Sequence, residues 1–178
     1  MRFSKVALVL SLATAAPLAA QGVMGDMHRD VNEVQKKFVD LAKAIPESAY
    51  GWRPGAGVRS VGEVFLHVTG ENYLLPMMMG MAVPAATGLT ADPKSADTFE
   101  HRTLTKAQIV AELEASFKNL HQGMALTTDA NGAEVIKFFG QDWSRNRAMV
   151  LTVTHLHEHL GQSIAYARSN KVVPPWSK

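Results

Sequence analysis

The sequence contains no cysteine, and this absence excludes several kinds of chemistry. Disulfide bonds cannot stabilise the fold, no thiolate can ligate zinc, and no cysteine can act as a nucleophile. Stability must therefore come from a packed core, to which a bound metal can add. Any sulfur chemistry would have to arrive with a substrate.

Long apolar runs are also absent after residue 20. Residues 1–20 have the pattern of a signal peptide, in which Arg2 and Lys5 form a positive end, residues 6–16 an apolar stretch, and residues 17–20 a small-residue exit. We expect this segment to be removed and the protein to be exported, to the periplasm or the outside of the cell. The apolar stretch is too short for a membrane span, which needs about 20 apolar residues.

A charge excess is absent once the signal segment is set aside. The formal net charge of the whole chain is +2. The segment carries two basic residues and no acidic ones, so the remaining chain is formally neutral. Nothing in this balance favours a nucleic-acid partner.

Strand-like alternation is likewise not evident, whereas helical spacing dominates residues 21–178. These residues have the length of one ordinary domain, and we expect a single all-α domain folded as a four-helix bundle. The expected helices run from about Met24 to Ala44, from Val61 to about Met79, from Thr105 to near Thr127, and from a cap at Ser144 to about Ser169. We expect Gly80 to Thr103 to be a long connection, and Ile136 to Trp143 to be a short extended or irregular piece.

The last expected helix carries His155 and His159, four residues apart. On a helix this spacing separates two side chains by about 40° around the axis, so both imidazoles can bind one ion. His67, on the second expected helix, would supply a third ligand if the two helices were neighbours. Three imidazoles and an open position are the ligand set of a catalytic divalent-metal site.

Three further residues are candidates for the same site. Glu71 is one helical turn from His67, where it could orient the imidazole or act as a base. Gln162 and Tyr166 share the helical face of the histidine pair and are expected to line a pocket. The alternative interpretation is structural: the histidines would be hydrogen-bonded core residues, and Glu71 a solvated carboxylate.

Two other metal chemistries are less favoured. Residues 155–159 match the inverted His-x-x-Glu-His pattern of some metallopeptidases, but no acidic residue follows Glu158 to complete such a ligand set. Met77 to Met79, with Met81, suggest a copper site, yet methionines among leucines are more simply explained by packing.

Several motifs together resemble one known family. They are His155 to Gln162, followed by Tyr166, Arg168 and Val172 to Pro175, and, earlier, Trp52 to Pro54, followed by Val58 to Val64 and His67. These stretches resemble the last helix and the metal-ligand helix of the DinB/YfiT-like family, and the likeness extends over nearly the whole mature chain.

This resemblance implies a four-helix bundle that binds one divalent metal, zinc or nickel, through His67, His155 and His159. Some relatives are transferases or isomerases that use a low-molecular-weight thiol such as bacillithiol or mycothiol, and a homodimer is a reasonable expectation. Export and the lack of a basic cluster near the site weigh against a thiol. The expected function is a metal-dependent hydrolase or thiol-dependent transferase acting on a small molecule, and the alternative is a non-catalytic metal-binding envelope or stress protein.

Overall fold

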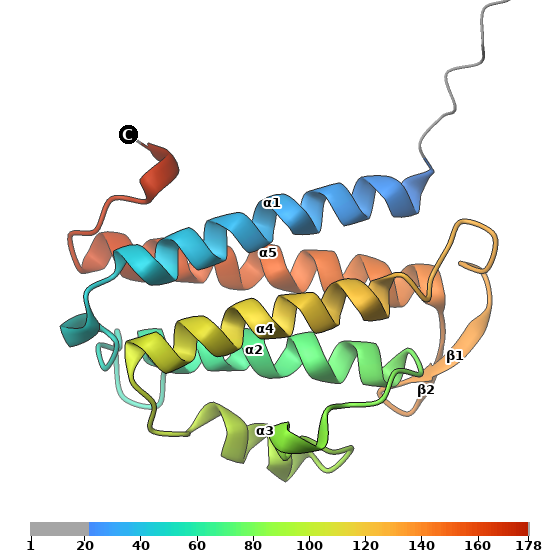
Figure 1. The fold of residues 1–178 in the computed structure, drawn as a ribbon, viewed down its shortest axis with the longest axis horizontal. Helices are drawn as coiled ribbons and strands as arrows, with labels where there is room; N and C mark the ends of the chain where they lie inside the picture. Colours follow the sequence, from blue (N-terminus) through green and yellow to red (C-terminus); the bar gives the residue numbers. More distant parts are fainter. Residues whose placement is uncertain (1–21, 178) are drawn as a thin grey trace, which may run out of the picture.

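The structure of the chain is a computed structural model that describes residues 22–177 (Figure 1). Four long helices run along one another, which confirms the predicted four-helix bundle. They are α1 (Val23–Ala44), α2 (Val61–Met78), α4 (Lys106–Met124) and α5 (Arg145–Ser169). The predicted signal segment, residues 1–20, lies outside the described residues. No described helix combines the length and apolar character that a membrane span requires.

The four helices begin and end within three residues of the predicted positions because their caps are encoded locally. At the start of α2, the Ser60 hydroxyl accepts a hydrogen bond from the backbone N–H of Glu63, whose carboxylate accepts one from the backbone N–H of Ser60. This reciprocal capping box satisfies amide groups that the first turn of a helix leaves unpaired. Thr105 and Gln108 form the same arrangement at the start of α4.

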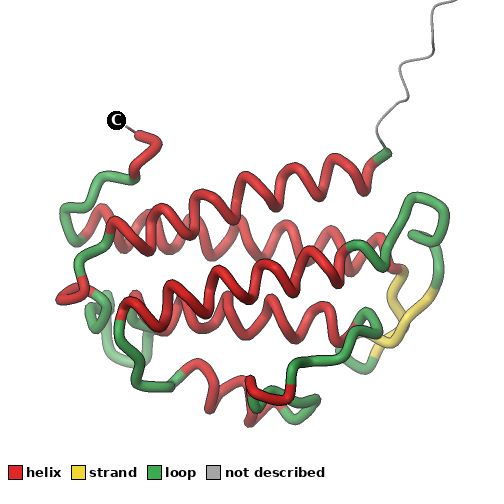
Figure 2. Tube along the Cα trace, viewed as in Figure 1, coloured by secondary structure: helices red, strands yellow, loops and turns green. Residues whose placement is uncertain are grey.

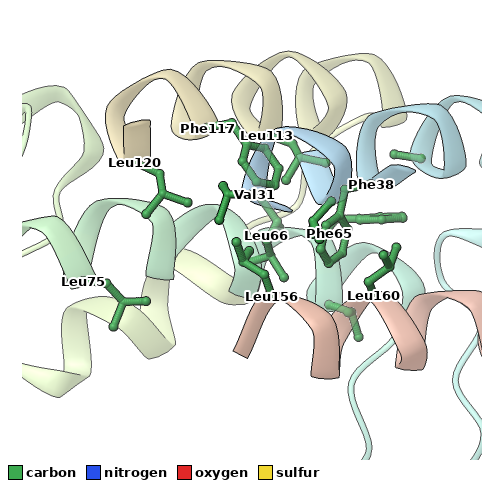
Figure 3. Packing of buried hydrophobic residues seen from close by; sticks show 14 of the residues in the cluster. Val31, Phe38, Phe65, Leu66, Leu75, Leu113, Phe117, Leu120, Leu156 and Leu160 are labelled. Atoms are coloured by element: carbon green, nitrogen blue, oxygen red, sulfur yellow. The ribbon is translucent and has the colours of Figure 1, made fainter. Parts of the chain in front are cut away.

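The core lies where the apolar faces of the four helices meet (Figure 3). Phe38 of α1 is fully buried, with its ring centroid 6.5 Å from that of Phe65 on α2 and 6.0 Å from that of Phe117 on α4. Leu156 of α5 closes the same cluster. Burying a side chain of this size contributes about 1.5–3 kcal/mol, so this contact region anchors the helices that carry the histidines.

The long connection predicted between α2 and α4 is present, but it includes regular structure that was not expected. It contains a fifth helix, α3 (Pro93–Glu100), which lies against α2. Asp92 caps α3 by accepting a hydrogen bond from the backbone N–H of Lys94, and Pro93 occupies the first helical position. Both are established helix-start signals, but the helix is only eight residues long.

The ambiguous stretch between α4 and α5 forms a two-stranded antiparallel hairpin at one end of the bundle (Figure 2). Its strands are β1 (Val135–Phe138) and β2 (Gln141–Ser144), joined at Phe139 and Gly140, which both have positive φ angles. Three short 3-10 turns complete the described chain: Glu47–Ala49, Ala85–Thr87 and Pro175–Ser177.

Gly123 permits the close approach of α4 to α2. A Cβ atom at this position would lie 2.3 Å from Cβ of Pro76, far inside van der Waals contact. Gly161 of α5 differs, because a Cβ atom there would meet nothing within 4 Å. Only the first of these two helical glycines is required by packing.

We predict that Gly123→Ala lowers the free energy of unfolding by about 1–3 kcal/mol, because the added methyl group overpacks the α2–α4 contact. The matched control, Gly161→Ala, should raise it by roughly 0.5–1 kcal/mol, because alanine is the better helix former in open space. Urea unfolding followed by circular dichroism measures both values. Equal effects of the two substitutions would contradict the close contact.

Candidate metal centre

The structure brings the three predicted histidines together. His155 and His159 lie one turn apart on α5, and His67 reaches them from α2. One ring nitrogen from each lies within 4.8 Å of those of the other two. The ring centroids are 5.4 Å apart for His67 and His155, 4.6 Å for His67 and His159, and 4.4 Å for the α5 pair. A side chain of one helix thus meets two from its neighbour.

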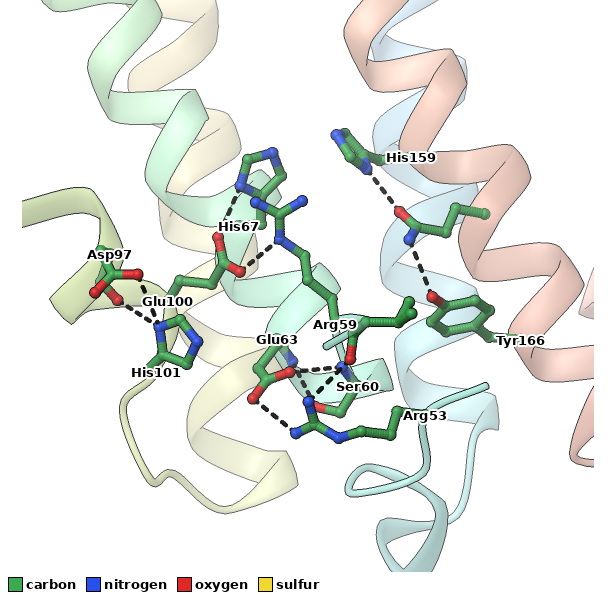
Figure 4. Close-up of polar contacts among 12 residues, drawn as sticks. Arg53, Arg59, Ser60, Glu63, His67, Asp97, Glu100, His101, His159 and Tyr166 are labelled. Carbon is green, nitrogen blue, oxygen red and sulfur yellow. Dashed lines mark hydrogen bonds and ion pairs between the residues drawn. The ribbon is translucent and has the colours of Figure 1, made fainter. Parts of the chain in front are cut away.

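Hydrogen bonds fix the orientation of two of the rings (Figure 4). Nδ1 of His67 lies 3.0 Å from a carboxylate oxygen of Glu100, and Nδ1 of His159 lies 2.8 Å from the amide oxygen of Gln162. An oxygen acceptor places the proton of a neutral ring on Nδ1 and leaves the lone pair on Nε2. Gln162 is itself held, since its amide nitrogen donates to the Tyr166 hydroxyl over 3.1 Å.

Nε2 of His155 is buried and has no hydrogen-bond partner among the described residues. Leaving a buried polar atom unpaired costs about 1–3 kcal/mol. An imidazole nitrogen in this condition, beside two other imidazoles, has the donor character that a divalent cation requires. The residues present therefore fit a metal, and the orphaned atom is the observation that shows the fit.

Burial also sets the charge of the cluster. Burial lowers the pKa of His155 to about 3, and positive charge on His159 or His67 would lower it in the same direction. Burial likewise lowers the pKa of His159, against the smaller opposing effect of the Gln162 hydrogen bond. Both rings are therefore neutral at physiological pH, the form in which imidazole binds a metal.

Glu100, at the end of α3, is a site residue that the sequence did not reveal. Burial alone would raise the pKa of its carboxyl group, but hydrogen bonds from His67 and Arg59 hold that pKa at about 2. The sequence signal was present, since Asp92-Pro93 starts a helix on which Ala96 and Glu100 share one face. It was obscured because the helix lies inside a long, turn-rich connection.

A basic cluster was not expected near the site, and one arginine, Arg59, does lie there. Its Nε atom donates to Glu100 over 2.5 Å, so one arginine does reach the histidine cluster. Arg59 therefore pairs with one carboxylate oxygen of Glu100, and Nδ1 of His67 contacts the other. Among the described residues, Arg59 is the arginine that forms an ion pair at the cluster.

Glu71 lies one turn beyond His67, but it is Glu100 that accepts the hydrogen bond from that ring. Burial raises the pKa of Glu71, and positive charge on Arg59, or on His67 if it were protonated, would oppose this rise. Glu71 lines a pocket of about 490 Å³ together with Met77 and Met78. These two methionines also pack against the core, as the packing interpretation predicted.

Other residues of the predicted region have clear places. Tyr166 is buried, and its ring lies 5.3 Å from that of Trp52 in an edge-to-face contact. His157 and Glu158 are both exposed on α5. Nε2 of His157 pairs with Asp30 at 2.7 Å, outside the cluster. In the metallopeptidase pattern His157 is a variable position, and the required glutamate, Glu158, is exposed.

The fold and the histidine cluster together define a helical-bundle protein with a site suited to one divalent metal. A sequence model of the DinB superfamily matches residues 31–163, and the chain belongs to this superfamily. No curated protein matched the chain by sequence.

Solved structures show the same fold. A DinB-like protein from Bacillus cereus ATCC 10987 superposes with a TM-score of 0.70 at 13% identity, covering 87% of this chain and 97% of that one. A conserved protein from Enterococcus faecalis gives a TM-score of 0.66 at 15% identity, with 84% and 97% covered. At these identities the likeness supports the architecture alone.

We predict that His155→Leu leaves the stability of the metal-free protein unchanged or raises it by about 1 kcal/mol, because it removes an unpaired buried nitrogen. The difference should favour the variant increasingly as the pH falls from 6.5 towards 3. In this range the unfolded wild-type chain takes up a proton that folded His155, with its pKa of about 3, does not. Thermal unfolding in the presence of a chelator measures this, and a loss above 2 kcal/mol would indicate a structural histidine.

Proposed function

We propose that this chain is a metal-dependent enzyme of the DinB superfamily that acts on a small molecule. His67, His155 and His159 hold one divalent cation, zinc or nickel. The observation that carries this proposal is the buried Nε2 of His155, which has no hydrogen-bond partner within residues 22–177, beside two rings whose Nδ1 atoms are already hydrogen-bonded. Nitrogen ligands suit both metals.

The protein's own residues supply orientation and proton transfer. A divalent cation with an open coordination position, when bound, makes a water molecule or a thiol at that position more acidic. Glu100 and Gln162 hold two of the rings in place, and Tyr166 supports Gln162. Glu71 has a raised pKa, lies one helical turn from His67 and lines the pocket, which suits a residue that accepts a proton and returns it to a leaving group.

Hydrolysis is the reaction we favour over thiol-dependent transfer. A low-molecular-weight thiol with carboxylate groups requires free basic side chains to hold it. Arg59 is the basic side chain that reaches the cluster, and it is paired with Glu100. A thiol-dependent transferase remains the second candidate, because a thiol can take the same place as water at an open position.

A non-catalytic metal-binding role is supported less well. Structural zinc sites close their fourth position with a protein ligand, whereas catalytic sites leave it open. Among the described residues the cluster consists of three histidines, without a fourth ligand from histidine, aspartate or glutamate. An open position is therefore part of the proposal.

The metal content of the purified protein tests this proposal. We expect about one equivalent of zinc or nickel per chain by elemental analysis, and its loss in His155→Ala and His159→Ala, because each change removes one of three ligands. His157→Ala is the matched control, since this exposed histidine of the same helix pairs with Asp30 and should leave the metal content unchanged. Full metal content in either ligand variant would overturn the proposal.

A second measurement tests the role of Glu100. We predict that Glu100→Gln weakens zinc binding by about 10–100-fold, because the anionic partner that orients His67 and strengthens its donor nitrogen is lost. Competition with a chromogenic chelator gives the dissociation constant. Glu112→Gln is the control: this carboxylate pairs with Arg102, away from the cluster, and its loss should not change zinc affinity. Equal affinities of wild type and Glu100→Gln would contradict the role.

A further inference from the structure

The pocket beside Glu71 lies between α2, α3 and the turn of the hairpin. Its volume of about 490 Å³ is within the usual range for small-molecule sites, roughly 300–1,000 Å³. Most of its lining is apolar. The lining residues that matter here are Leu74, Met77, Met78, Pro93, Ala96 and Phe139.

One face of α2 connects this pocket with the histidine cluster. His67, Glu71, Leu74 and Met78 follow one another at spacings of four, three and four residues, so they form a single stripe along the helix. His67 belongs to the cluster, and the other three line the pocket. Helical side chains lean towards the N-terminus, which directs Glu71 back towards His67. The stripe is polar at the cluster and apolar beyond it.

One face of α3 also reaches from the cluster to the pocket, with its C-terminal end at the cluster and its N-terminal end at the pocket. Glu100 bonds His67, whereas Ala96 and Pro93, four and seven residues earlier, line the pocket. The two helices are in close contact, since a Cβ atom at Gly70 of α2 would meet the Phe99 ring of α3 at 3.4 Å. The wall of the pocket is therefore continuous with the wall of the cluster on both helices.

The hairpin supplies the outer wall through Phe139. This residue has a φ angle of 48°, a region in which a bulky side chain is unusual, and it is 55% exposed. An exposed aromatic ring at the edge of an apolar pocket is a ready contact surface for a hydrocarbon group.

The charged groups of the pocket, apart from Glu71, are already engaged. Asp92 caps α3, and Lys137 pairs with Asp142 at 2.6 Å. A sugar or a phosphate in this pocket would lack partners for its polar atoms, and buried unpaired polar atoms are costly. The lining selects for a hydrocarbon group.

We propose that this pocket binds the hydrocarbon part, alkyl or aryl, of a small amphipathic substrate whose polar reactive group lies at Glu71. This inference deepens the proposed function and rests on it, because the reactive group must also reach the histidine cluster. The binding step itself requires only the pocket, so it can be measured separately from metal binding.

Straight-chain alcohols from 1-butanol to 1-octanol serve as probes, and their dissociation constants are measured by titration calorimetry on the full-length protein as purified. We expect affinity to rise about fourfold for each added methylene group until the pocket is filled, the gain for transferring one such group out of water. Repeating the titration with one equivalent of Zn²⁺ added should preserve this dependence on chain length.

Two variants place the binding in this pocket. Ala96→Trp fills the pocket from α3, and Phe139→Ser removes its outer wall; each should weaken 1-octanol binding at least tenfold. The control is Ala165→Trp, which adds the same side chain at an exposed position of α5 and should bind 1-octanol as the wild type does. Phe139 is exposed, so its variant gives a result even if Ala96→Trp does not fold.

The possible failures are distinguishable. Affinity that does not depend on chain length, or wild-type affinity in Phe139→Ser, would overturn the pocket assignment whatever the metal content. A dimer in sedimentation velocity that Phe139→Ser dissociates, with unchanged alcohol binding, would assign this surface to a second copy of the chain instead. Normal alcohol binding by a protein that takes up no metal would defeat only the proposed function.

Discussion

The fold must hold three imidazole rings against one another in a largely buried place, and this requirement constrains the rest of the site. In the part of the chain that the structure describes, Nε2 of His155 has no hydrogen-bond partner, at a cost of about 1–3 kcal/mol. The core around Phe38 and Phe65 offsets that cost by fixing α1, α2 and α4 on one another. Functional sites often contain such locally unfavourable groups, and packing elsewhere in the protein offsets their cost.

The site combines contributions from parts of the chain with different roles. The helices of the bundle, α2 and α5, provide the histidines, and their positions depend on the core. The segments inserted between bundle helices provide the surroundings: α3 contributes Glu100, and the hairpin contributes Phe139. Glu71 links the histidine cluster to the pocket, because it shares a face of α2 with His67 and also lines the pocket.

Much of this arrangement was predictable from the sequence, for local reasons. Capping residues such as Ser60 and Thr105 set the helix starts, and the four-residue spacing of His155 and His159 guaranteed a shared face. What was missed depends on tertiary contact. The eight-residue α3 is stable only against α2, and the choice of Glu100 rather than Glu71 as the partner of His67 follows from how those helices meet. No periodicity along a single segment contains that information.

The placement of Glu100 on a short inserted helix has an evolutionary consequence. Insertions and replacements between the long helices leave the four-helix core undisturbed, because connecting segments tolerate change better than packed elements do. Yet a change in α3 would alter both the carboxylate that accepts a hydrogen bond from His67 and the shape of the adjoining pocket. Diversification of chemistry within such a scaffold can therefore proceed through its connections, while the histidine-bearing helices remain the same.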